Sequence, residues 1–345
     1  MRDHYVAYMT QRLQLWNKER VPHLATLDYA RFILWNMDSE PKASAWNHKG
    51  DVVEGLGWVP SYVPDCKGRI LRGNYVAHFS WLEGHYGHYM HDHMPTIAYL
   101  RAVVPPTTKF LLLNRPVTHK VLKFVDPDFY HNRIEWYEVG KPVHVMGELT
   151  VPVVDAMPFS TRHVMLNYLR RWLVETHPTV PTKRTVVFYT RSGSTDRRGG
   201  RVLEKNHERQ VLDRIRKAMI RHRRPERLIV FNGQVDGKTM SVAKQYEIFR
   251  SAQTVIGPHG TGLGGNMGWT DPHPKDCASR VQLLEFIPGA DSEQVQSIYT
   301  SHYPFWGGLP LDYHTILYTG NSTKYNTYVN LDDLDRALDA MWTRR

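Results

Sequence analysis

A histidine followed by a run of glycines is the most chemically informative stretch of the sequence. An apolar segment, 254–256, leads towards His259, and glycines stand at positions 260, 262, 264, 265 and 268. Glycine lets the backbone approach a ligand closely because it has no Cβ. If a helix begins within this glycine-rich stretch, the free N–H groups of its first turn can bind a phosphate. The pattern is typical of nucleotide sites in α/β proteins, although a flexible surface loop is also rich in glycine.

Charged residues near two other strand ends suit the same chemistry. Arg191 and Arg201 flank a polar loop, and their guanidinium groups could hold a diphosphate. Alternatively, residues 197–201 form a solvated basic loop or a nucleic-acid contact. Glu285 lies at the end of an apolar strand, where an unpaired carboxylate is costly. Its partner is then either a ribose diol or a nearby arginine.

The first half of the chain carries four histidines and an aspartate within residues 84–95. In a helix, His88, His91 and Asp92 lie three or four residues apart and share a face. A histidine beside a carboxylate can act as a general base. The same residue types also bind zinc or manganese, or simply form hydrogen bonds in a crowded core. The segment therefore predicts a catalytic base, a metal site or a packed core.

The elements that position these residues follow from hydrophobic periodicity. Residues 177–183 hold two prolines and predict a hinge. After it, strands and helices alternate, which predicts a parallel sheet with ligands at the carboxyl ends of its strands. The expected strands there are 184–190, 227–231, 254–257, 281–287 and 313–318, and the expected helices are 208–222, 242–252 and 331–342.

Before the hinge the pattern is less regular. The first fifty residues are rich in tryptophan and predict irregular structure with a helix over 8–20. Beyond them we expect strands at 74–81, 109–113, 133–139 and 142–154, and helices at 93–104, 117–125 and 161–176. The whole chain is therefore expected to be an α/β protein.

Length and charge bound the remaining possibilities. A chain of 345 residues with 41% hydrophobic composition is long enough for two domains. A net charge of +10 predicts an anionic partner. Cys66 and Cys277 are too few for a disulfide scaffold or a cysteine-based zinc site. Without a run of about twenty apolar residues or an apolar amino terminus, we expect neither a membrane span nor a signal peptide.

Several of these segments, taken together, resemble glycosyltransferase family 61. The matching stretches lie between about residues 70 and 290: 87–95, Arg191 and Arg201 with Asn206, Gln245 in a helix that ends at 252, 256–263, and 284–288. The resemblance implies a GT-B fold, with two Rossmann-like domains facing across a cleft. It also implies inverting transfer of xylose, N-acetylglucosamine or a related sugar from a UDP-sugar to a hydroxyl of a glycan or glycoprotein.

The resemblance also implies roles for domains and residues. The acceptor-side domain is 1–178, the nucleotide-sugar domain is 179–330, and the helix within 331–345 is expected to pack on the N-terminal domain. Asp92 or His88 is the implied base. The implied reaction requires no metal, and no nucleic-acid partner is expected. The implied nucleotide contacts are Arg191, Arg201, Gln245, His259, Gly260, Thr261, Gly262, Leu263 and Glu285. The family commonly has Gly-Ala-Gly where this chain has Gly-Thr-Gly at 260–262. In the family an acidic residue also follows the arginine that corresponds to Arg201, and either Glu204 or Glu208 fills that position here.

Two other functions remain open on sequence alone. A metal-dependent hydrolase would use the histidines within 85–93 as ligands. A nucleic-acid-binding protein would use the basic residues 197–201 and 221–224. The Asp-x-Asp sequences 126–128 and 333–335 are discounted as metal motifs because they fall at or within predicted helices. The chain alone indicates a cytoplasmic enzyme, or one of the Golgi or endoplasmic reticulum lumen if an anchor has been removed.

Overall fold

The computed structural model describes residues 23–28, 31–37, 40–46, 68–78, 86–153, 162–178, 184–192, 201–270, 280–288, 311–321 and 326–343. It is a mixed α/β protein with parallel sheets. The chain divides into two compact units, Met1–His177 and Pro178–Arg345. The predicted helix over 8–20 and most of the predicted hinge lie outside the described residues.

The first unit contains a five-stranded sheet in the order β1-β9-β5-β6-β7. The strands are β1 (His23–Asp28), β5 (Tyr75–Ala77), β6 (Lys109–Leu113), β7 (Ile134–Tyr137) and β9 (Glu148–Val153). They pair in parallel, except that β1 is antiparallel to β9. Along the chain, β6 and β7 follow β5 on one side while β9 lies on the other. The sheet order therefore reverses between β5 and β9, and in open α/β sheets ligands bind at such a reversal.

Helices α3 (Met94–Val103) and α6 (Arg162–Thr176) of this unit pack against each other. Asp126 joins α6 to the short helix α5 (Pro127–Asn132), because its carboxylate accepts from Phe129 N at 2.9 Å and from Trp172 Nε1 at 2.9 Å. Asp126 is thus the N-cap of a helix. This agrees with discounting residues 126–128 as a metal motif.

A four-stranded sheet in the order β3-β2-β8-β4 completes the first unit. Its strands are β2 (Arg31–Met37), β3 (Glu40–Trp46), β4 (Arg69–Arg72) and β8 (Val143–Met146). The expectation of irregular structure in the first fifty residues is therefore wrong, since β1, β2 and β3 all lie there. Strand β1 pairs with β9, over a hundred residues away in sequence, so tertiary pairing rather than local pattern defines it. Strands β2 and β3 pair with each other as antiparallel neighbours, and β2 also pairs with the distant β8.

The second unit is built on a six-stranded sheet in the order β11-β10-β14-β15-β16-β17. The strands are β10 (Thr185–Tyr189), β11 (Arg227–Phe231), β14 (Ala252–Pro258), β15 (Val281–Pro288), β16 (Leu311–Asn321) and β17 (Asn326–Val329). All pair in parallel except β17, which is antiparallel to β16. This sheet reverses its order between β10 and β14. Both strands are apolar and buried, as strands covered by helices on two faces must be.

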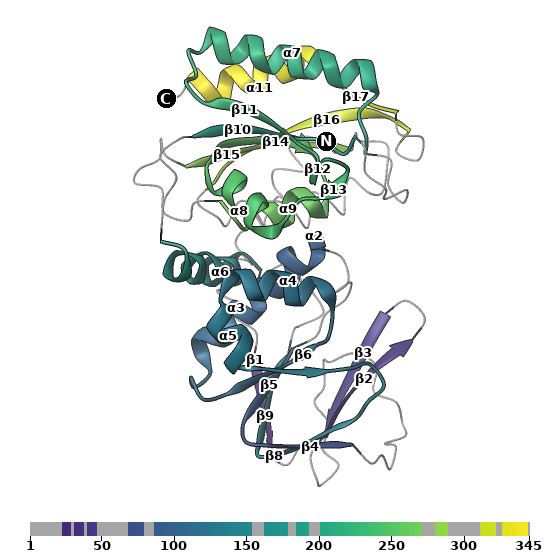
Figure 1. The fold of residues 1–345 in the computed structure, drawn as a ribbon. Coiled ribbons are helices and arrows are strands. Elements are labelled where there is room, and N and C mark those ends of the chain that lie inside the picture. Colours follow the sequence, from purple (N-terminus) through teal and green to yellow (C-terminus); the bar gives the residue numbers. More distant parts are fainter. Residues whose placement is uncertain are drawn as a thin grey trace, which may run out of the picture. The chain divides into compact units, whose positions relative to one another are not determined.

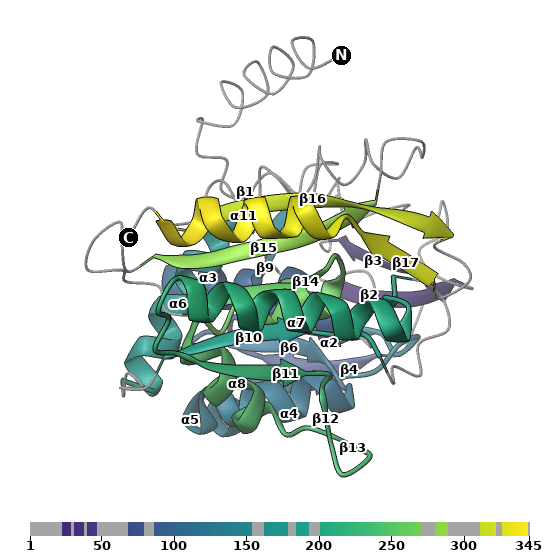
Figure 2. The same ribbon diagram turned by 90° about the horizontal axis from the view of Figure 1, so that it is seen from above.

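Helices cover both faces of this sheet. Helices α7 (Lys205–Arg221) and α11 (Leu331–Thr343) lie on one face, and α8 (Val242–Arg250) and α9 (Thr261–Met267) on the other (Figure 1). Seen from above, α7 and α11 lie side by side over the sheet and run roughly along its strands (Figure 2). The core beneath them is built from apolar side chains of both helices and of the central strands.

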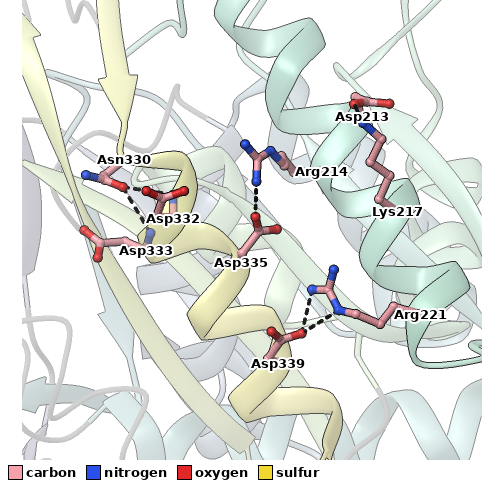
Figure 3. A network of polar contacts seen from close by, with 9 residues as sticks. All are labelled: Asp213, Arg214, Lys217, Arg221, Asn330, Asp332, Asp333, Asp335 and Asp339. Atoms are coloured by element: carbon pink, nitrogen blue, oxygen red, sulfur yellow. Dashed lines mark hydrogen bonds and ion pairs between the residues drawn. The ribbon is translucent and has the colours of Figure 1, made fainter.

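Helix α11 packs on α7 through its apolar face. Its apolar residues Leu334, Leu338 and Met341 are buried in the core that it shares with α7, and it also packs against β16. Its acidic residues pair with α7: Arg214 binds Asp335, and Arg221 Nη2 donates to Asp339 at 2.6 Å (Figure 3). The helix therefore packs on α7 and β16 within the second unit, and its expected packing on the N-terminal domain stays a prediction. Its sequence showed an apolar face but not the partner of that face.

Candidate functional site

The carboxyl ends of β10 and β14 bring the predicted arginine and glycine residues together. Arg191 follows β10, and His259 and Gly260 follow β14. Since β10 and β14 are parallel neighbours, with Phe188 opposite Ile256, these residues lie at the same edge of the sheet. It is also the point at which the order of the sheet reverses, where open α/β sheets bind ligands.

Two guanidinium groups converge on Gly260. Arg191 Nη1 lies 2.6 Å, and Arg201 Nη1 4.0 Å, from the position that a Cβ on Gly260 would occupy. Arg191 Nη1 also lies 3.5 Å from the carbonyl oxygen of His259. Two cations held so close together favour an anion beside them, and a diphosphate offers several oxygens to both. We call Arg191, Arg201 and Gly260 the arginine site.

Glu208 fixes the chain on both sides of Arg191. Its Oε2 accepts from Thr190 Oγ1 at 2.5 Å and from Ser192 Oγ at 2.7 Å. The backbone N–H of Ser192 in turn donates to Thr190 Oγ1 at 3.0 Å. Hydrogen bonds to a carboxylate are stronger than those between neutral groups. The backbone of Arg191 is therefore clamped to α7, which restricts where its side chain can reach.

Arg201 is positioned through β17. Thr327, which is fully buried, donates from its N–H and from Oγ1 to the carbonyl of Val202, at 3.2 and 3.0 Å. Its own carbonyl accepts from Glu204 N at 3.2 Å. The backbone that carries Arg201 is thus held to the edge of the sheet by three hydrogen bonds.

Glu204 and Glu208 have different tasks. Glu204 is the N-cap of α7, accepting from Asn206 N at 2.9 Å and His207 N at 2.8 Å. These backbone hydrogen bonds, that from Asn206 first, lower the pKa of the Glu204 carboxyl. Only Glu208 contacts the residues that flank Arg191. Of the two acidic candidates from the sequence, Glu208 is therefore the one built into the site.

The glycines near this site make room for the protein's own side chains. A Cβ on Gly257 would lie 2.9 Å from Cβ of Tyr189 and even closer to the carbonyl oxygen of that residue. A Cβ on Gly262 would collide with the hydroxyl of Tyr189. The sequence interpretation, in which the absence of a Cβ lets a ligand approach the backbone, thus misses a second role: Gly257 and Gly262 leave room for Tyr189. Helix α9 does open at Thr261, but it has only seven residues, so the arginines carry the electrostatic argument.

Glu285 is paired with protein groups. Its Oε1 accepts from His259 Nδ1 at 2.8 Å, and its Oε2 accepts from Tyr313 Oη at 2.7 Å. The carboxylate is buried, with 1% of its side chain exposed. The partners of Glu285 in the described structure are thus a histidine and a tyrosine, and its contact with a ribose diol stays a prediction. Glu285 orients the imidazole of His259 beside the arginine site.

Three more of the implied nucleotide contacts have different surroundings. Gln245 is buried on α8, where its Nε2 donates to the carbonyl of Met240 at 3.0 Å. This bond ties α8 to the preceding turn and gives Gln245 a role in the fold. Leu263 is fully buried within α9. The side chain of Thr261 lies outside the described part of the chain.

The histidine-rich segment of the first unit follows β5. It consists of α2 (Tyr86–His88) and a π-helical turn, Tyr89–His93, which runs directly into α3. His91 and His93 are buried, whereas His88 is half-buried. The ring of His93 lies 5.5 Å from that of Tyr89, stacked, and 5.2 Å from that of His78. We call residues 86–93 the histidine segment.

A π-helical turn interrupts the predicted helix. Residues 89–93 form this turn, and a π-helical turn shifts the side chains of later residues relative to a regular α-helix. His88 is half-buried and His91 is buried, and the common face expected for His88, His91 and Asp92 stays a prediction. The side chain of Asp92 lies outside the described residues. Single π-helical turns occur frequently at functional sites.

Metal and nucleic-acid alternatives were also open. Within the described residues, no group of three His, Cys, Asp or Glu side chains is arranged to hold a metal ion, but His85 and the Asp92 side chain fall outside them. In the basic run 221–224, Arg221 pairs with Asp339, while Arg224 pairs with Glu226 at 2.5 Å. Two of its arginines are thus engaged within the fold.

Comparison with known proteins decides the family. The family model Glycosyltransferase 61 matches residues 86–275, which is more than half of the chain. The chain belongs to glycosyltransferase family 61. The match spans both the histidine segment and the arginine site, so the resemblance drawn from the sequence is confirmed. Membership of family 61 implies glycosyl transfer, with a nucleotide-sugar donor and a sugar-accepting substrate.

Other comparisons add less. No curated protein matches the sequence significantly. Among solved structures, the E. coli heptosyltransferase WaaC with ADP is similar with a TM-score of 0.38 and 10% identity, over 80% of this chain and 100% of that chain. Among the helices that the structure describes, none is both long and apolar enough to cross a membrane.

Proposed function

We propose that this family 61 protein is an inverting glycosyltransferase that uses a UDP-sugar. It transfers xylose, N-acetylglucosamine or a related sugar to a hydroxyl of a glycan or glycoprotein. The observation that carries the proposal is the convergence of Arg191 and Arg201 on Gly260 at the reversal point of a parallel sheet. A GT-B arrangement of two Rossmann-like domains, 1–178 and 179–330, is part of the same proposal.

The reaction is a direct displacement at the anomeric carbon. The acceptor oxygen forms a bond to that carbon while the bond from the carbon to the diphosphate oxygen breaks. The acceptor proton passes to the carboxylate of Asp92 or to the imidazole of His88. UDP leaves with the bonding electrons, and the configuration at the anomeric carbon inverts.

The arginine site would stabilise the leaving diphosphate. Preorganised donors aimed at developing charge are worth about 3–4 kcal/mol each in well-studied enzymes. The bonds from Glu208 and Thr327 support preorganisation, because they fix the backbone before any ligand binds. His259, oriented by Glu285, and the backbone of residues 260–263 would complete the contacts to the nucleotide. In this scheme the guanidinium groups neutralise the diphosphate, so no divalent ion is required.

A thermal-shift panel of nucleotides and nucleotide sugars tests the proposal. Ligand at a hundred times its dissociation constant stabilises a folded protein by about 2.7 kcal/mol, so a true donor nucleotide is readily detected. We expect UDP and one or more UDP-sugars to raise the melting temperature, with or without EDTA. Stabilisation by other nucleotides alone, or by none, would contradict the proposal.

A further inference from the structure

Tyr318 is a buried tyrosine whose hydroxyl has no assigned contact. It lies near the carboxyl end of β16, opposite Pro288 of β15, and only 2% of the residue is exposed. Its hydroxyl oxygen is inaccessible to solvent and has no hydrogen-bond partner among the described residues. Buried hydroxyl groups in folded proteins nearly always have a partner, so this one needs an explanation.

The fold places Tyr318 next to the backbone that carries Arg201. Tyr318 pairs across the strands with Val329 of β17, and both residues share a core cluster with Leu203. Leu203 is two residues from Arg201 and forms a bridge to Thr327 of the same strand β17. Because β10, β14, β15 and β16 are parallel, their carboxyl ends all lie at the edge that holds the arginine site.

The hydroxyl is a hydrogen-bond donor in the field of both arginines. Burial raises the pKa of Tyr318, and the positive charges of Arg201 and then Arg191 oppose that rise. The phenol therefore keeps its proton at neutral pH. Guanidinium groups donate hydrogen bonds and never accept them, so neither Arg191 nor Arg201 can accept the phenolic proton of Tyr318.

We propose that Tyr318 is a third ligand-binding residue of the arginine site, and that its hydroxyl donates a hydrogen bond to a phosphate oxygen of the nucleoside diphosphate. This inference rests on the proposed function and deepens it. A phenol adds direction to the binding of the phosphate without adding a third positive charge beside the two arginines. An anion at the arginine site would supply the acceptor that the buried hydroxyl needs.

The variant Tyr318→Phe tests this role, because it removes the hydroxyl and keeps the ring in the core. Calorimetric titration with UDP and with inorganic pyrophosphate should show about ten-fold weaker binding of both, the usual worth of one such hydrogen bond. The melting temperature without ligand should stay the same or rise, because a buried hydroxyl is lost. Tyr328→Phe is the matched control on β17, since that side chain is substantially exposed, and it should bind both ligands like wild type.

The outcomes separate this inference from the function on which it rests. If wild type binds UDP and Tyr318→Phe binds it equally well, Tyr318 has no role in the ligand site while the proposed function stands. A variant that loses stability without ligand along with affinity would assign the hydroxyl to the fold and overturn the inference. If wild type binds neither UDP nor pyrophosphate, the proposed function and the role of Tyr318 both fail.

Discussion

The arginine site and the histidine segment both follow strands at which their sheets reverse order, but they are built differently. The arginine site collects residues that follow β10, follow β14 and precede α7, and Glu208 and Thr327 fix its backbone through hydrogen bonds. The histidine segment comes from one stretch of chain, in which a π-helical turn buries His91 and His93. A site for a multiply charged ligand needs donors from several directions, whereas a base needs one reactive side chain at the right place.

Charge separates the two regions as well. The arginine site concentrates fixed positive charge, since guanidinium groups stay protonated. The histidine segment gathers imidazoles, whose protonation responds to pH near neutrality. Substitutions in the first region should therefore change binding of the nucleotide, and substitutions in the second should change turnover.

The largest expected effect is the loss of turnover in Asp92→Asn. The amide keeps nearly the volume of the carboxylate but cannot accept a proton, so the rate should fall by about 100- to 10,000-fold. The UDP affinity, measured by titration, should stay close to that of wild type.

His88→Ala is the companion variant. A severe loss in His88→Ala with a mild loss in Asp92→Asn would make the imidazole the base, and reversible inactivation by EDTA would indicate a metal site.

Two glycines of the second unit should separate binding from folding. Gly257→Ala forces its new methyl group against the backbone of Tyr189, and overpacking of this kind costs about 1–3 kcal/mol of unfolding free energy. The new methyl group of Gly260→Ala would lie too close to the flexible end of Arg191 and in ordinary contact with that of Arg201. It should therefore displace the Arg191 guanidinium and weaken UDP binding about ten-fold with little loss of stability. Chemical denaturation and titration of both variants measure the two effects. Equal UDP affinity in Gly260→Ala would show that the position of Arg191 is unimportant.

Glu208→Gln should have a smaller effect on binding. The variant replaces two hydrogen bonds to a carboxylate by bonds to a neutral amide, which loosens Thr190 and Ser192 around Arg191. We expect UDP to bind about three- to ten-fold more weakly, with the loss depending on Arg191. In an Arg191→Ala background, Glu208→Gln should therefore change the affinity little. Asp213→Asn, on the same helix and paired with Lys217 at 2.8 Å, is the control that should bind normally.

The smallest expected effect concerns the packing of α11 on α7. His222 and Arg221 lower the pKa of Asp339, the hydrogen bond from His222 being the largest cause. A carboxyl with a lowered pKa stabilises the fold above its unfolded pKa, and this contribution is lost as the pH falls through the folded value. Because Asp339 is half exposed, Asp339→Asn should cost only about 0.5 kcal/mol at neutral pH. Urea unfolding should show this difference shrinking below about pH 4, and a difference that persists there would contradict the assignment.

The sequence predicted elements well where the local pattern alone decides the structure. Strands 109–113 and 227–231 coincide with β6 and β11, because each is a short run of apolar residues bounded by polar ones. It failed for β1, whose partner strand β9 lies far along the chain, and for the neighbouring strands β2 and β3, which pair with each other. The sequence likewise indicated the apolar face of α11 but not the elements α7 and β16 that cover it.

The candidate site was predictable in residue types but not in partners. The sequence indicated His259 and Glu285 separately, yet their contact depends on the parallel register that sets Gly257 opposite Glu285. Gln245 matches a position of the family motif, but its side chain donates a hydrogen bond to Met240 in the turn before its own helix. Glu208 could not be distinguished from Glu204 until α7 was seen to begin between them. Tyr318 carried no signal, because an aromatic residue in a strand is ordinary.

The most direct test of the arginine site is the affinity for UDP of the double variant Arg191→Ala/Arg201→Ala. Each guanidinium should be worth about 1.5–3 kcal/mol as a charge-assisted contact, so titration should show UDP binding weakened at least about 100-fold. The melting temperature without ligand should remain close to that of wild type, because both side chains lie outside the apolar core. Unchanged UDP affinity in a folded double variant would show that the two arginines do not bind the diphosphate.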